Sequence, residues 1–169
     1  MTAMALGLEA AERLGALMQR VGFALWQLQE LENTAAGYIV VRLRDARGVG
    51  VNQGAVISAE VEKLPLGKLV GELAKAGVID PALASRLKAA LDERNWLVHR
   101  SRREHRGVLS DPAAYTGLSM RLDALADDAL TLNKELARTM EEYVVNSGVS
   151  RDFIDGEAER LARAWGVLD

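Results

Sequence analysis

An arginine, an asparagine and a histidine suited to catalysis lie within one six-residue stretch of the chain. Arg94 and Asn95 are followed by His99, in the sequence Arg-Asn-Trp-Leu-Val-His. On a helix, Asn95 and His99 are adjacent, one turn apart, and Arg94 is displaced by about 100° from Asn95. An imidazole that titrates near neutral pH can remove or return a proton, and a guanidinium can bind phosphate oxygens and offset charge gained in a transition state. We therefore expect the three side chains to border one concavity.

Proton transfer and charge stabilisation are sufficient to cleave RNA without a metal ion. In that reaction the 2′-hydroxyl group attacks its own phosphodiester, so the substrate supplies the nucleophile. His99 is followed by arginines opposed only by Glu104, whereas the whole chain has a net charge of -3. His105, the second histidine, lies in the same segment and is a reserve candidate for acid-base chemistry. The positive charge is local, and it predicts RNA binding by Arg100, Arg102, Arg103 and Arg106.

Several common types of site are not supported by the residue patterns. The chain has no cysteine, which excludes disulfides, thiolate nucleophiles and cysteine-ligated zinc. His99 and His105 lack the four-residue spacing and the third ligand of a zinc site, and no serine lies in a Gly-x-Ser-x-Gly motif. Gly48, Gly50 and Gly54 are not followed by the Gly-Lys-Ser/Thr of a phosphate-binding loop. We expect neither a metal ion nor a cofactor.

Composition and periodicity indicate an all-α protein with a single domain that spans residues 1–169. The chain is 49% apolar, has few prolines and is rich in Ala, Leu, Glu and Arg, which favours helix over strand. Residues 48–63 show neither helix nor strand periodicity, so we predict a long loop there. Apolar residues recur at helical spacing in 8–44, 66–76, the segment from Asp80-Pro81, 113–146 and the segment after Ser150. The prediction is a four- to five-helix bundle with a long loop after the first helix.

The helix expected after Asp80-Pro81 carries an apolar stripe that Arg94 interrupts. Arg94 lies three residues after Leu91 and four before Val98, so its guanidinium emerges from a face otherwise suited to burial. One interpretation is purely structural: Arg94 pairs with an acid on a neighbouring helix, and His99 is a helix-terminal histidine favoured by the dipole. The stripe consists of Leu83, Leu87, Ala90, Leu91, Leu97 and Val98.

The stretch from Arg94 to His99 resembles the Arg-x4-6-His signature, commonly Arg-Asn-x3-His, of the HEPN superfamily (higher eukaryotes and prokaryotes nucleotide-binding). The segment 64–69 and the Asp80-Pro81 helix start fit the helix order of that fold. HEPN domains are helical bundles that commonly dimerise and bring two such motifs into a shared cleft. Many are metal-independent endoribonucleases of toxin, antiviral or RNA-processing systems.

The resemblance implies a role for each residue of the motif and a set of partners. Arg94 and His99 would be the catalytic pair, Asn95 would orient them, and the apolar stripe would continue into a homodimer interface. RNA is the implied substrate, and a cognate antitoxin or inhibitor is a further partner that the resemblance allows. The alternative is a non-catalytic HEPN-like dimeric module that binds a nucleotide or a partner helix.

The start of the chain and its hydropathy pattern indicate location. The apolar stretch 1–8 is interrupted by Glu9, Glu12 and Arg13 before the core of a signal peptide can form, and no stretch approaches membrane-spanning length. We therefore expect an unprocessed cytoplasmic protein with no membrane partner.

Overall fold

The computed structural model describes residues 3–44, 46 and 49–167, with side chains placed from residue 7 onward. In this part of the chain every regular element is a helix, which confirms the all-α prediction. The α-helices are α1 (Ala3–Arg42), α2 (Val51–Val61), α3 (Leu66–Ala76), α4 (Pro81–His99), α5 (Ser101–Glu104), α6 (Pro112–Asn146) and α7 (Arg151–Ala164), and η1 (Val108–Ser110) is a short 3-10 helix.

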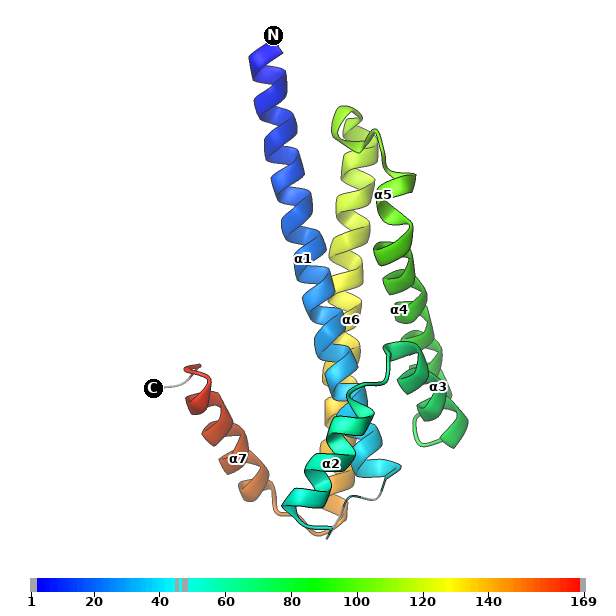
Figure 1. Ribbon diagram of the computed structural model, residues 1–169, viewed down its shortest axis with the longest axis vertical. Helices are drawn as coiled ribbons and strands as arrows, with labels where there is room; N and C mark the ends of the chain where they lie inside the picture. The colour runs from blue at the N-terminus through cyan, green and yellow to red at the C-terminus, as the bar shows by residue number, and fades with distance from the viewer. Residues whose placement is uncertain (1–2, 45, 47–48, 168–169) are drawn as a thin grey trace.

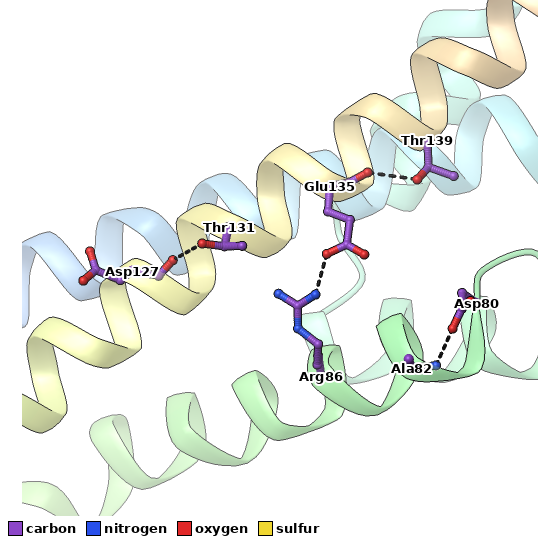
Figure 2. A network of polar contacts seen from close by, with 7 residues as sticks. All are labelled: Asp80, Ala82, Arg86, Asp127, Thr131, Glu135 and Thr139. Atoms are coloured by element: carbon purple, nitrogen blue, oxygen red, sulfur yellow. Dashed lines mark hydrogen bonds and ion pairs between the residues drawn. The ribbon is translucent and has the colours of Figure 1, made fainter.

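Two long helices, α1 and α6, form the axis of the molecule and run side by side in the same direction (Figure 1). Their parallel course is clear from contacts along their length: Arg20 pairs with Asp123 near one end, and Arg42 stacks over Tyr143 near the other. Helix α4 runs antiparallel to α6, with Arg86 paired to Glu135 (Figure 2). Helix α3 packs against α1 and α4. The bundle therefore consists of α1, α3, α4 and α6.

The buried core is divided into two clusters along the bundle. One cluster joins the second half of α1 to α3, the first half of α4 and the end of α6, and includes Leu69 and Leu87. The other joins the first half of α1 to the end of α4 and the start of α6, and includes Trp96 and Leu122. On α4 the first cluster reaches Leu91 and the second begins at Trp96. Arg94 therefore lies on α4 at the boundary between the two clusters.

Local sequence signals set the ends of the bundle helices as expected. The Asp80 carboxylate accepts a hydrogen bond from the Ala82 backbone N–H at 2.6 Å (Figure 2), and that of Asp111 accepts from Ala113 at 2.9 Å. These caps satisfy N–H groups that have no partner within the helix. Gly77 ends α3 with φ +61°, a conformation that glycine adopts without steric cost. The predicted helix starts at Asp80-Pro81 and Asp111-Pro112 and the predicted helix end at Gly77 are confirmed.

The predicted long loop over residues 48–63 is wrong, because Val51–Val61 forms α2. Gly50, with φ +79°, precedes the helix, and Gly54 lies within its first turns. Ile57 and Val61 are one turn apart, and Val61 is buried in the core cluster that α1 and α3 share. One buried residue gives only a weak periodic pattern in the sequence of this segment. The helix is therefore held in place by packing against the rest of the protein. With α2, the short α5 and α7 outside that bundle, the described chain has more helices than the four or five predicted.

Candidate functional site

The three residues of the Arg-Asn-x3-His motif lie in the last two turns of α4. His99 is the final residue of the helix and is exposed, whereas Arg94 and Asn95 are half-buried. The positive charge of a protonated imidazole is favoured at this end of a helix, where carbonyl groups point out of the last turn. The expectation that His99 ends a helix is confirmed.

Arg94 has no carboxylate partner among the residues that the structure describes. Its one polar side-chain contact is a long hydrogen bond, 3.4 Å, from Nη1 to Oδ1 of the neighbouring Asn95. By contrast, two other arginines between α4 and α6 are paired: Arg86 with Glu135 and Arg121 with Glu93. A half-buried cation without a counter-charge is costly unless another group satisfies it. The structural interpretation, in which Arg94 pairs with an acid on a neighbouring helix, is therefore wrong for the single chain.

Arg94 and His99 point in different directions around α4. Arg94 and His99 are five residues apart, which places them about 140° apart around α4 and about 7.5 Å apart along it. The hollows described on the surface are lined by other residues, and none of them includes Arg94, Asn95 or His99. None of these four hollows brings the three side chains together. A second surface has to complete the site if the three residues act together.

Trp96, within the motif, anchors the end of α4 to α6 and α5. Its indole is only 2% exposed and lies beneath the Arg121 guanidinium, whose carbon is 3.4 Å from the ring centroid. The same guanidinium donates two hydrogen bonds of 2.8 Å to the Glu93 carboxylate, one from Nε and one from Nη2. The Trp96 Nε1–H donates to Glu104 Oε2 at 2.8 Å. The four side chains therefore fix the rotation of α4 about its own axis.

The side chains of Glu93, Trp96, Glu104 and Arg121 form an anchor for α4, and their contacts also affect the pKa of Arg121. The hydrogen bonds from Arg121 to Glu93 raise the pKa of the Arg121 guanidinium, and this effect exceeds the opposite effect of burial. The arginine therefore stays charged over the accessible pH range, and the anchor persists with it.

The rotation of α4 decides which side of the apolar stripe is covered. Trp96 lies in the core, whereas Val98 is 48% exposed. Val98 belongs to the predicted apolar stripe but is not covered within the single chain, because α6 contacts α4 on the side of Glu93 and Trp96. Val98 is instead an exposed apolar residue immediately before His99.

The predicted RNA-binding arginines remain exposed and close to the motif. Arg100 joins α4 to α5, Arg102 and Arg103 lie in α5, and Arg106 lies in the turn that follows. No ion pair to any of the four is formed within the described chain, and Glu104, the only acid of the segment, is engaged by Trp96. Their charge is therefore available to an anionic partner.

His105, the reserve candidate, is held in place by its neighbours. Its Nδ1 lies 3.0 Å from the backbone carbonyl oxygen of Ser101, so Nδ1 carries the proton and donates it. The ring meets Trp96 edge to face, with centroids 5.8 Å apart. His105 lines a groove between α1 and α5, and His99 is not among the residues that line it. The two histidines therefore belong to different surfaces.

Sequence reasoning missed the four residues of the anchor: Glu93, Trp96, Glu104 and Arg121. A tryptophan inside the motif, with an acid three residues before it, was the available signal. Arg121 comes from another helix, and its stacking on Trp96 depends on the antiparallel register of α4 and α6, which no local pattern contains.

Two further observations concern the whole of the described chain. No three histidine, aspartate or glutamate side chains of residues 7–44, 46 and 49–167 converge in a way that would hold a metal ion. No described helix is both long enough and apolar enough to cross a membrane.

The chain matches no family model, and no curated protein or solved structure is significantly similar to it.

Proposed function

We propose that the protein is a metal-independent endoribonuclease whose active site forms where the α4 ends of two copies meet. The observation that carries this proposal is Arg94, a half-buried arginine with no carboxylate partner in the described chain. A phosphodiester would supply the missing counter-charge, with two oxygens that match the guanidinium fork. Exposed His99 lies on the same helix end, and Asn95 holds Arg94 by the hydrogen bond to its Oδ1.

A second copy would bring together residues that one helix keeps apart. A two-fold axis beside α4 places His99 of one copy opposite Arg94 of the other, which overcomes their separation of about 140° around a single helix. Val98, which is exposed next to the motif, gives this surface an apolar contact to bury. Association through this face would therefore cover the exposed part of the stripe and bring both His99 and both Arg94 side chains into one composite site on the two-fold axis.

The reaction that fits these residues is internal transesterification of RNA. One His99 removes the proton of a 2′-hydroxyl group, the 2′-oxygen forms a bond to phosphorus, and the bond from phosphorus to the 5′-oxygen breaks. The 5′-oxygen takes a proton from the other His99 in its imidazolium form. Arg94 stabilises the negative charge that develops on the phosphoryl oxygens. The products are a 2′,3′-cyclic phosphate and a 5′-hydroxyl end.

The exposed arginines after His99 would bind RNA through its phosphates, without selecting a base sequence. Arg100, Arg102, Arg103 and Arg106 would contact phosphates on either side of the cleaved bond, so binding would weaken steeply with salt. Unselective cleavage of cellular RNA would harm the host, which supports a toxin or defence role with a cognate inhibitor.

The test is cleavage of total cellular RNA by the purified protein in the presence of a chelator. Wild-type protein should yield 2′,3′-cyclic phosphate ends, and both His99→Ala and Arg94→Ala should lower the rate by at least about 100-fold. His105→Ala and Arg86→Ala are matched controls, because they remove a histidine and an arginine outside the motif and should leave the rate unchanged. Equal activity in His99→Ala and wild type would refute the mechanism.

A further inference from the structure

Helix α5, at the end of α4 (Figure 1), contains or flanks the four arginines proposed to bind RNA. Arg102 and Arg103 lie in the helix, Arg100 precedes it, and Arg106 lies in the turn that follows. The helix is a single turn of four residues, Ser101–Glu104, and none of them is buried. A helix of that length is not stable by itself in water. The arrangement of the arginines therefore depends on the contacts that hold α5 to the rest of the chain.

Side-chain contacts connect both ends of α5 to the end of α4. The Ser101 hydroxyl donates a hydrogen bond to the Leu97 carbonyl oxygen at 2.6 Å. The Trp96 Nε1–H donates to Glu104 Oε2 at 2.8 Å. The ring of His105, which follows α5 directly, meets the Trp96 ring edge to face. The bond from Ser101 holds the first residue of α5, and the bond between Trp96 and Glu104 holds its last residue.

The Glu104 carboxylate bonds to the Trp96 indole although a cation lies within its own segment. Arg100 precedes Glu104 by four residues, the spacing at which opposite charges pair on a helix. No ion pair joins the two in the part of the chain that the structure describes. The pKa of the Arg121 guanidinium is raised by hydrogen bonds to Glu93 and, to a smaller extent, by the charge of Glu104. The carboxylate therefore interacts with the anchor of α4 and leaves Arg100 unpaired by it.

Trp96 gives this hydrogen bond a fixed donor. Its side chain is 2% exposed and lies beneath the Arg121 guanidinium, so the core sets its position. A buried indole N–H without an acceptor is costly, and Glu104 supplies the acceptor. The same hydrogen bond thus satisfies a buried donor and holds a helix that is too short to hold itself.

We propose that Glu104 is a positioning residue for RNA binding. Its hydrogen bond to Trp96, here termed the latch, holds α5 against α4 and keeps Arg100, Arg102 and Arg103 in one arrangement. Side chains that are already ordered lose less conformational freedom when RNA binds. The cost of the negative charge is smaller, because solvent and salt screen the exposed carboxylate. An acid within the basic segment therefore strengthens RNA binding. This inference rests on the RNA binding of the proposed function and does not depend on cleavage.

The test is binding of a fluorescein-labelled oligouridine in which every 2′-hydroxyl group is methylated, followed by fluorescence anisotropy. This probe keeps the phosphates of RNA but lacks the nucleophile of the proposed reaction, so it stays intact. Glu104→Gln keeps an oxygen that can accept from Trp96 and removes the charge, whereas Glu104→Ala removes both. Glu104→Gln should bind the probe at least as tightly as wild type. Glu104→Ala should bind at least about threefold more weakly than Glu104→Gln, although the two variants have the same net charge.

Two comparisons control for effects other than the latch. In the Trp96→Phe background no indole N–H remains at this position, so Glu104→Gln and Glu104→Ala should bind the probe equally. Glu12 is an exposed acid on α1, outside the basic segment. Glu12→Gln and Glu12→Ala should therefore also bind the probe equally.

Exchange of the indole N–H with solvent, followed by NMR in deuterated buffer without RNA, observes the latch directly. The chain has three tryptophans. Trp26 and Trp165 are 65% and 81% exposed, so their N–H groups are references for fast exchange. In wild type and in Glu104→Gln, the Trp96 N–H should exchange at least about tenfold more slowly than these references. In Glu104→Ala it should exchange faster than in Glu104→Gln.

Equal binding of the probe by Glu104→Gln and Glu104→Ala would overturn the inference, and so would equal exchange of the Trp96 N–H in the two variants. Cleavage of ordinary RNA together with equal binding would refute the latch and leave the ribonuclease proposal in place. Intact ordinary RNA together with the expected difference in binding would refute the ribonuclease and support the latch. The two proposals can therefore fail separately.

Discussion

The guanidinium carbon of Arg121 lies 3.4 Å from the centroid of the Trp96 ring, close enough for the two planar groups to be stacked. The same arginine forms a two-point hydrogen bond with Glu93, one turn before Trp96 on α4. Stacking and pairing therefore act on one helix face, and together they turn Trp96 inward. Val98 and His99 are left on the outer side, where a second molecule or a substrate can reach them.

Replacement of Arg121 by lysine should show that this anchor depends on geometry as well as charge. Arg121→Lys keeps the positive charge but loses the flat surface and the two-point hydrogen bond. Because each side chain is 40% exposed, solvent screens part of the ion pair, and we expect a loss of about 1–2 kcal/mol in the free energy of unfolding by urea. Arg20→Lys is the control, since Arg20 pairs with exposed Asp123 and should lose less than about 0.5 kcal/mol. Equal losses in the two variants would contradict the role of stacking.

Replacement of Arg94, unlike replacement of Arg121, should not lower the stability of the protein. Arg94→Met removes a half-buried charge that has no carboxylate partner in the described chain. The free energy of unfolding should therefore remain within about 0.5 kcal/mol of wild type or rise. Arg121→Met, measured in the same urea titration, should lose about 2 kcal/mol. A large loss in Arg94→Met would mean that Arg94 is a structural residue.

Replacement by alanine should have opposite effects on stability at two glycines, one inside α3 and one just after it. A Cβ atom at Gly71 would meet nothing within 4 Å, and Gly71 lies in the interior of the helix. Gly71→Ala should therefore stabilise the protein by about 0.5–1 kcal/mol. Gly77 has φ +61°, so Gly77→Ala should cost about 1 kcal/mol. Thermal unfolding of the two variants measures both effects, and destabilisation by Gly71→Ala would show that α3 is packed more tightly than described.

Tyr38 should make stability depend on pH in alkaline solution. Its hydroxyl donates to the Val78 carbonyl oxygen at 3.0 Å, and burial raises the pKa of Tyr38 above 10.0, although nearby Arg42 opposes this. The native state then holds the phenolic proton more tightly than the unfolded chain, so stability falls as the pH rises from 10.0 through the folded pKa.

Tyr38→Phe isolates that contribution. Near neutral pH the variant should be about 1 kcal/mol less stable than wild type, because the hydrogen bond to Val78 is lost. The difference in urea unfolding free energy should shrink when the pH is raised above 10.0, since phenylalanine does not titrate. A difference that stays constant with pH would show that the phenolic proton is not held more tightly in the folded state.

Local sequence signals determined a helix of this protein wherever a capping residue is followed by a clear apolar stripe. Asp80 before Pro81 and Asp111 before Pro112 start α4 and α6 at the predicted places, because a carboxylate there satisfies backbone N–H groups within two or three residues. Gly77 ends α3 for an equally local reason. Residues 51–61 lack such signals, and only their packing against α1 makes them a helix.

The surroundings of the candidate site were decided by tertiary structure. Spacing alone identified Arg94, Asn95 and His99 and set their directions around a helix. It did not determine that Arg94 would lie at the boundary of two core clusters without an acid beside it, or that Val98 would remain exposed. Those facts depend on Arg121, 25 residues beyond Trp96, reaching back to stack on its ring. A stripe of apolar residues specifies that a helix has an inner face, but the contacts from other helices choose its rotation.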